Sequence, residues 1–169
     1  MVISAVLTDR LLLDIPLCLL GTMITCLLLL LSLGSVEGAG TYIKDFRDMV
    51  LETMNREVSD FNFYGCQCGI LVSGKQIVDE TDRCCLAQFC MYKTIRTVDC
   101  NPSLARYYYT YRDGTITCED EDESSCARKT CESDRKTVMC LMSHKYSEVN
   151  AKYKLFGKCS GKRPPCNQL

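Results

Sequence analysis

Cysteine content constrains this chain more than any other feature, because 14 of its 169 residues are cysteines. Cytosolic proteins keep their thiols reduced, so a count this high indicates either metal clusters or disulfides formed in an oxidising compartment. Zinc clusters need closely spaced cysteine pairs with further cysteine or histidine ligands. Here the two closest pairs are Cys66-x-Cys68 and Cys84-Cys85, and the chain has a single histidine, His144. We therefore predict a small secreted domain held together by disulfides.

The N-terminal region has the pattern of a secretory signal. Residues 15–33 contain no charged side chain and are followed by small or polar residues, which is typical of a cleaved signal peptide. Cleavage after Gly38, or after Gly40, would leave twelve cysteines, an even number as a complete set of disulfides requires. We predict a signal peptide at 1–38 and an extracellular domain at 39–169.

Two alternatives are open for this segment. Its apolar run of about 19 residues is long enough to cross a bilayer as an uncleaved signal anchor. Translation could also begin at Met23. All three possibilities place the rest of the chain in an oxidising space, so we expect the domain to be secreted and extracellular.

Hydrophobic periodicity predicts three helices. In the first, four side chains follow the i, i+3, i+4, i+7 spacing that places them on one helix face: Phe46, Met49, Val50 and Thr53. The second opens with acidic residues and contains neither proline nor glycine. The third has Ser124 as its candidate N-cap. The predicted ranges are 44–54, 79–98 and 124–145.

The segments between and after the helices carry turn signals. Residues 106–118 alternate aromatic and β-forming side chains around Asp113-Gly114, which predicts a two-stranded hairpin. Residues 64–75 are rich in glycine and cysteine and are predicted to form a loop. The tail from residue 155 onward contains glycines and prolines and is predicted to be irregular.

Charge is balanced overall, with 20 basic and 21 acidic residues, but it is unevenly distributed. Residues 119–123 are all acidic, whereas residues 128–169 carry ten basic and three acidic side chains. A basic C-terminal third suits an anionic membrane surface, a heparan-like polymer or a receptor. The simpler interpretation is a solvated helix face and tail. We expect no nucleic-acid partner.

Two motifs carry a resemblance to a known family. The first is Tyr64-Gly65-Cys66-Gln67-Cys68-Gly69, and the second is Asp79-x-x-Asp82-Arg83-Cys84-Cys85-x4-Cys90-x-Tyr92. Together they resemble the secreted phospholipase A2 family, closest to its group II. The resemblance implies a mainly α, small disulfide-rich fold with an N-terminal helix, a Gly-rich loop, two long antiparallel helices and a two-stranded β-wing.

The resemblance also implies a disulfide pattern. A seventh family bridge is missing here, because its two positions hold Met91 and Ser133. Because both cysteines of this bridge are absent, neither position leaves an unpaired thiol, and we expect the fold to persist. The six implied bridges are Cys66–Cys159, Cys68–Cys85, Cys84–Cys140, Cys90–Cys166, Cys100–Cys126 and Cys118–Cys131.

The catalytic positions depart from the family's pattern. Members of the family use a histidine as general base, an aspartate and two tyrosines to orient it, and a second aspartate to hold Ca²⁺. The orienting groups correspond to Asp134, Tyr92 and Tyr107, but the histidine position is Gln88 and the calcium position is Phe89. Glutamine has no titratable group near neutral pH and cannot act as a general base. We therefore expect a catalytically inactive homologue.

The calcium loop is changed as well. The carbonyls that the resemblance assigns to Ca²⁺ belong to Gln67, Gly69 and Leu71, and Phe89 supplies no oxygen ligand. The family needs glycines after Gly69, where this chain has Ile70, Leu71 and Val72. We expect the calcium site to be lost and no cofactor to be bound.

Three functional hypotheses follow. The first is a binding protein that takes a phospholipid or fatty acyl chain in an apolar slot, although the same side chains could simply fill the former site as core. The second is a residual calcium-dependent phospholipase A2 that hydrolyses the sn-2 ester of phospholipids. The third is an extracellular matrix or receptor-ligand protein without lipid binding. The candidate slot residues are Phe46, Met49, Val50, Ile70, Leu71 and Phe89.

Overall fold

The computed structural model describes residues 43–69 and 74–168, and every structural statement below refers to these residues. The predicted signal peptide at 1–38 and the predicted site residues Ile70 and Leu71 lie outside the described residues. Among the helices described, none has the length and apolar character needed to cross a bilayer.

Three α-helices form the main part of the structure. They are α3 (Lys44–Met54), α4 (Glu80–Ile95) and α5 (Cys126–Met142). The first has the predicted bounds, and the other two lie within their predicted ranges. Asp79 begins α4, because its carboxylate accepts the backbone N–H of Asp82 at 2.8 Å.

The N-cap of α5 is one residue later than predicted. The hydroxyl of Ser125 accepts the backbone N–H of Arg128 at 3.0 Å, so Ser125 is the cap. The predicted cap, Ser124, instead donates its hydroxyl to the carboxylate of Asp122 at 2.6 Å. Two adjacent serines have the same capping preference, and only the path of the backbone decides between them.

The predicted hairpin is confirmed, with strands β1 (Tyr109–Arg112) and β2 (Thr115–Cys118) paired antiparallel. Asp113 and Gly114 have φ values of 49° and 77°, the left-handed pair that a two-residue type I′ turn requires. The tail is less irregular than predicted, because it contains two short 3₁₀ turns, Tyr153–Phe156 and Cys166–Gln168. A further 3₁₀ turn spans Val58–Phe61.

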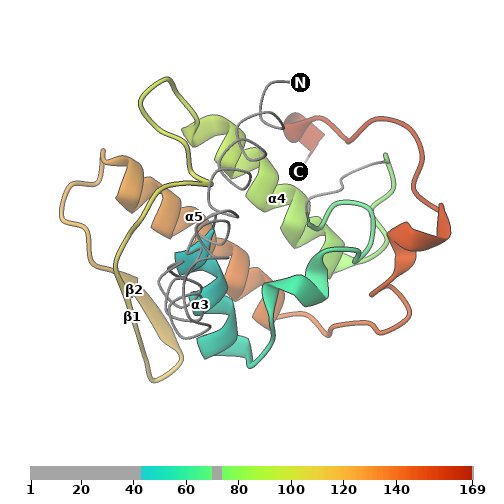
Figure 1. Ribbon diagram of the computed structural model, residues 1–169, viewed down its shortest axis with the longest axis horizontal. Helices are drawn as coiled ribbons and strands as arrows, with labels where there is room; N and C mark the ends of the chain where they lie inside the picture. The colour runs from blue at the N-terminus through green and yellow to red at the C-terminus, as the bar shows by residue number, and fades with distance from the viewer. Residues whose placement is uncertain (1–42, 70–73, 169) are drawn as a thin grey trace, which may run out of the picture. The chain divides into compact units, whose positions relative to one another are not determined.

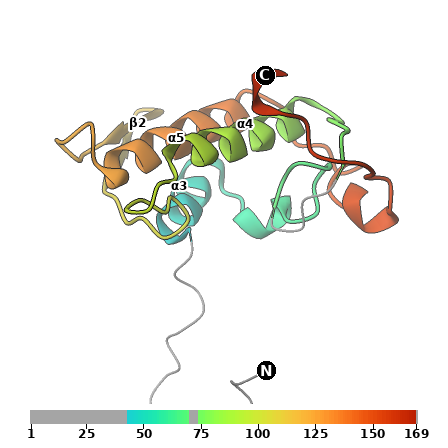
Figure 2. The same ribbon diagram turned by 90° about the horizontal axis from the view of Figure 1, so that it is seen from above.

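The elements form two layers. Helices α4 and α5 lie side by side and antiparallel, and the β-wing extends from one end of the pair (Figure 1). Figure 2 shows α3 and the following loop beneath this pair. The core between the layers is apolar, and its buried members include Phe46, Met49, Val50, Phe61, Val138 and Leu141.

All six disulfides implied by the resemblance are present, and none of the described cysteines is free. Each bridge typically stabilises a domain by roughly 2–4 kcal/mol. Among the described residues, Cys84–Cys140 is the one bridge that joins α4 directly to α5. At Met91 and Ser133 no disulfide joins the two helices.

Candidate functional site

A buried polar cluster surrounds Asp134 of α5, which is 1% exposed. Its Oδ1 accepts hydrogen bonds from Gln88 Nε2 at 3.0 Å and from the Tyr92 hydroxyl at 2.8 Å. Its Oδ2 accepts the Tyr107 hydroxyl at 2.7 Å. Gln88 and Tyr92 are four residues apart on α4 and therefore share one helix face. The structure thus brings together the four residues that sequence analysis grouped.

Burial dominates the electrostatics of this cluster. Loss of solvation raises the pKa of Asp134 to about 7, although hydrogen bonds from Tyr107, Gln88 and Tyr92 pull it down. Burial and the neighbouring Asp134 carboxylate raise the pKa values of Tyr92 and Tyr107 well above their usual range, so both phenols stay protonated. Both Asp134 oxygens already accept bonds, and Gln88 does not titrate. The four side chains therefore fix one another but offer no free base to a water molecule.

A guanidinium lies beside the aromatic ring that replaces the family's calcium aspartate. The Arg163 guanidinium carbon is 3.6 Å from the ring centroid of Phe89, which is a cation–π contact. Arg163 Nε donates to the side-chain oxygen of Gln67 at 3.2 Å, and Nη2 donates to the backbone carbonyl of Gln67 at 3.3 Å. A backbone carbonyl that the resemblance assigns to Ca²⁺ therefore accepts a hydrogen bond from a positively charged side chain instead.

Sequence analysis did not identify Arg163. A signal for it exists, because Phe89 precedes Cys90, Arg163 lies three residues before Cys166, and these two cysteines are bonded. The bridge brings the C-terminal tail to α4, next to Phe89. A pairing inferred from the family could therefore have placed Arg163 near Phe89.

The loop before α4 is organised by the buried carboxylate of Asp82. This carboxylate accepts the backbone N–H groups of Cys66 at 3.1 Å, Gln67 at 2.7 Å and Val78 at 3.1 Å. Gly65 has a φ of 51°, and a Cβ there would lie 2.3 Å from the Asp82 carboxyl carbon. Glycine at this position lets the backbone approach the carboxylate.

A second cation reaches the same loop. Lys154 donates its ammonium group to the backbone carbonyl of Cys68. Burial lowers the pKa of both Lys154 and Arg163. Calcium in proteins takes six to eight oxygen ligands, usually with carboxylates among them. A phenyl ring and two side-chain cations at this loop do not fit that donor set.

Two adjoining cavities lie next to the cluster. The smaller, about 160 Å³, is mostly apolar and is lined by Phe46, Phe61 and Leu141 among others. The larger, about 300 Å³, is lined by Phe89 and three basic side chains, Lys93, Arg96 and Arg163. Residues common to both cavities show that they meet, namely Gly69, Cys85, Gln88 and Tyr92.

The predicted slot residues divide between cavity and core. Phe46 lines the smaller cavity and Phe89, 40% exposed, lines the larger one. Met49 and Val50 are completely buried in the core and do not line either cavity. Ile43 and Val58, which sequence analysis did not select, complete the apolar lining.

His144 lies close to two cysteine sulfurs, those of Cys84 and Cys140. These sulfurs form a disulfide and have no thiolate to offer a metal. The imidazole is exposed, and its Nδ1 lies 2.8 Å from the Cys140 carbonyl. This group is therefore part of the end of α5 and not a metal centre.

Comparison with known proteins identifies the relatives of this chain. The family profile described as phospholipase A2 matches residues 43–154. A mouse protein named membrane-associated phospholipase A2 is 33% identical over 140 residues, which cover 81% of this chain and 93% of its own length. Basic phospholipase A2 homolog LmutTX of Lachesis muta muta is 38% identical over 115 residues, 68% of this chain and 91% of its own. Acidic phospholipase A2 inhibitor vaspin A chain of Vipera aspis zinnikeri is 37% identical over 123 residues, which cover 72% of this chain and 86% of its own length.

Proposed function

The chain belongs to the phospholipase A2 family, and from that premise we propose that it binds a single-chain anionic lipid, such as a fatty acid, without hydrolysing phospholipid. The relatives named above include a phospholipase, a homologue and an inhibitor, so membership alone leaves the activity open. The proposal rests on the residues at the site.

Loss of hydrolysis follows from two positions. General-base catalysis typically contributes about 10²–10⁴-fold in rate, and Gln88 cannot supply it. A metal ion that polarises the ester carbonyl contributes several kcal/mol, and Phe89 cannot hold one. Each loss alone would make turnover slow. Together they leave a site that positions a lipid but does not cleave it.

The observation that carries the proposal is the Arg163 guanidinium, which is fixed against Phe89 and Gln67 in the lining of the larger cavity. Guanidinium groups bind carboxylates through charge-assisted hydrogen bonds, which are stronger than neutral ones. Lys93 and Arg96 add positive charge to the same cavity. A protein cation thus replaces the metal ion as the partner for the lipid's negative group.

The smaller cavity supplies the apolar half of the site. Phe46, Phe61 and Leu141 are arranged to exclude water from a hydrocarbon chain that passes Gln88. Each buried methylene contributes about 0.8 kcal/mol, so affinity should rise about fourfold per added carbon until the cavity is filled. This length dependence separates a lipid slot from a filled core, which would accept no chain.

Titration calorimetry with decanoate in the presence of EDTA tests the proposal. We expect one saturable site, and we expect Arg163→Gln to weaken it by at least about tenfold, because a hydrogen bond between charged groups contributes about 1.5–3 kcal/mol. Lys162→Gln is the matched control, since it removes the same charge from an exposed neighbouring position. Decanol, which has the same chain but no charge, should bind more weakly. Equal affinity for decanol, or an unchanged affinity in Arg163→Gln, would contradict the proposed site.

A further inference from the structure

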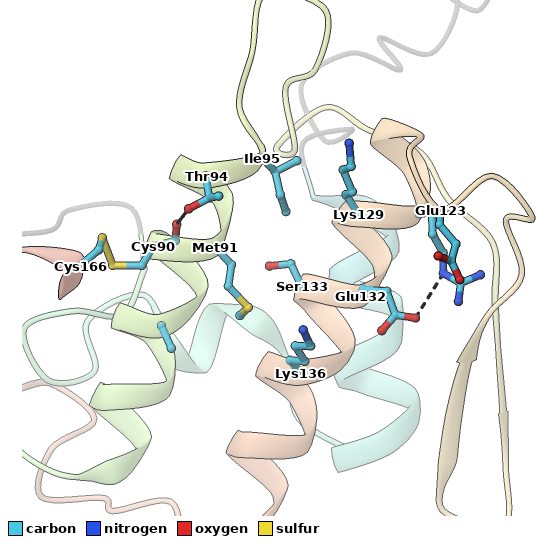
Figure 3. Close-up of a pocket in the computed structure, with 12 residues that line it drawn as sticks. Cys90, Met91, Thr94, Ile95, Glu123, Lys129, Glu132, Ser133, Lys136 and Cys166 are labelled. Carbon is cyan, nitrogen blue, oxygen red and sulfur yellow. Dashed lines mark hydrogen bonds and ion pairs between the residues drawn. A yellow bond between two sulfur atoms is a disulfide. The ribbon is translucent and has the colours of Figure 1, made fainter. Parts of the chain in front are cut away.

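A third cavity, a groove of about 730 Å³, lies between α4 and α5 and shares no lining residue with the two cavities described above. Figure 3 shows Met91 of α4 and Ser133 of α5 facing each other across it. The Cys90–Cys166 disulfide lies at one side. Small-molecule sites typically occupy about 300–1,000 Å³, so the groove has the size of a binding site.

Ser133 is the unusual member of this lining. Its side chain is only 3% exposed, and its hydroxyl has no hydrogen-bond partner among the described residues. The hydroxyls of Thr130 and Thr137 on the same helix donate to the carbonyls four residues earlier, at 2.7 Å and 2.9 Å. Buried polar groups are nearly always bonded, so an unsatisfied hydroxyl facing a cavity indicates a ligand atom.

Some charged side chains of the groove have an ion-pair partner and others do not. Arg128 is paired with Glu132 at 3.3 Å, and Glu132 also contacts Arg135. Lys129 and Lys136 lie four residues before and three residues after Ser133, hence on the same face of α5. Neither lysine has an ion-pair partner within the described part of the chain. Glu123 contributes one negative charge at the rim, so the groove is positive on balance.

We propose that this groove binds a small amphipathic organic anion. The apolar part of the ligand lies against Met91, Ile95 and Ala87, which supply the hydrocarbon surface of α4. Its anionic group accepts the Ser133 hydroxyl and lies between the ammonium groups of Lys129 and Lys136. The ligand is either a carboxylate or a sulfate-type anion, because both present oxygen acceptors to these donors.

The test uses 1-anilinonaphthalene-8-sulfonate as an aromatic sulfonate and octanoate as a carboxylate, with the native protein carrying ¹³C-labelled methionine methyl groups. Met91 reports on the groove, while Met49 in the core and Met139 on the exposed side of α5 are internal controls. We expect saturable shifts of the Met91 signal with either anion, an unchanged Met139 signal with either anion, and an unchanged Met49 signal with the sulfonate. The relative affinities of sulfonate and carboxylate identify the preferred anionic group.

Charge dependence is tested in the same experiment. N-phenyl-1-naphthylamine has the same rings without the sulfonate and should bind about tenfold more weakly. The double variant Lys129→Gln, Lys136→Gln should weaken sulfonate binding by about tenfold, whereas the matched pair Lys145→Gln, Lys152→Gln on exposed positions should not.

Arg163→Gln, which weakens the proposed fatty-acid site, should leave Met91 titration unchanged, so the two proposals fail independently. A Met91 signal that does not respond to either anion would overturn the proposal, as would equal binding of the uncharged probe.

Discussion

Ser133 and Asp134 are neighbours on α5 and are almost equally buried, at 3% and 1% exposed, yet their surroundings are opposite. Asp134 accepts three hydrogen bonds from α4 and from the segment before β1. The Ser133 hydroxyl has no partner among the described residues and faces a groove. A buried polar group whose bonds are all made within the protein is part of the scaffold, whereas an unsatisfied one facing a cavity marks a place for a ligand.

The same contrast separates two neighbouring parts of the helix pair, one joined by hydrogen bonds and one left open. Asp134 retains its partners because Gln88 donates a hydrogen bond to its carboxylate. Ser133 and Met91 occupy the positions of a bridge that the resemblance implies, and their side chains leave a groove in its place. Asp134 is therefore hydrogen-bonded to α4, whereas a groove lies between the helices at Met91 and Ser133.

The largest expected effect comes from removing the Asp134 carboxyl group. At pH 5 we predict that Asp134→Ala lowers the free energy of unfolding by about 3–4 kcal/mol, because Gln88, Tyr92 and Tyr107 each lose their buried acceptor. Urea unfolding of the disulfide-intact protein measures it. Asp134→Asn keeps an acceptor of the same shape and should cost clearly less. If both variants cost the same, the hydrogen bonds do not hold the cluster.

The pH dependence of stability is the next largest effect. Burial raises the pKa of Asp134 from 3.8 to about 7, so the folded state binds this proton more tightly than the unfolded state. Its contribution to stability is full below about pH 4 and is lost as the pH rises to about 7, on the order of a few kcal/mol. Subtracting the pH profile of Asp134→Asn isolates this contribution. A difference that stays flat from pH 4 to pH 7 would show that the carboxyl titrates normally.

Closing the groove covalently should have a smaller, stabilising effect. With Met91→Cys and Ser133→Cys together, we predict a disulfide that raises the free energy of unfolding by about 2 kcal/mol, less than for an isolated loop of this length because other bridges already restrict it. The mass of the oxidised protein shows whether the bridge has formed, and the thermal midpoint of unfolding measures the stabilisation. The same variant should no longer bind the aromatic sulfonate in the groove, as measured by the fluorescence of the probe. Undiminished binding in the fully oxidised variant would place the probe elsewhere.

The smallest effect is expected at Ser133 itself. Ser133→Ala should change the free energy of unfolding by less than about 0.5 kcal/mol, since no hydrogen bond is lost. Thr137→Val is the matched variant one turn away, and it should cost about 1 kcal/mol because its hydroxyl donates to the Ser133 carbonyl. Equal costs at the two positions would show that the Ser133 hydroxyl is bonded in the folded protein.

Local patterns were sufficient for much of the fold. The apolar spacing of Phe46 and Met49 predicted the bounds of α3, and Asp113-Gly114 predicted the turn, because both depend on residues close in sequence. The disulfide pairing came only from the family resemblance, since twelve cysteines allow many pairings. The choice of Ser125 over Ser124 as N-cap depended on the backbone path, which composition does not encode.

The candidate site was predictable where the family supplied a pattern and not elsewhere. The grouping of Gln88 with Asp134 followed from aligned positions. The contact between Arg163 and Phe89 joins residues far apart in sequence through the Cys90–Cys166 bridge, and the groove at Ser133 depends on which side chains fill the space between two helices. Neither is a property of a local segment.

Fatty acid released from phosphatidylglycerol vesicles, measured in calcium chloride and in EDTA, tests most directly whether this chain binds lipid without cleaving it. Purified protein that binds decanoate in EDTA should release no more fatty acid than buffer alone, in either solution. Release that requires calcium and disappears in Gln88→Ala would contradict the proposed function.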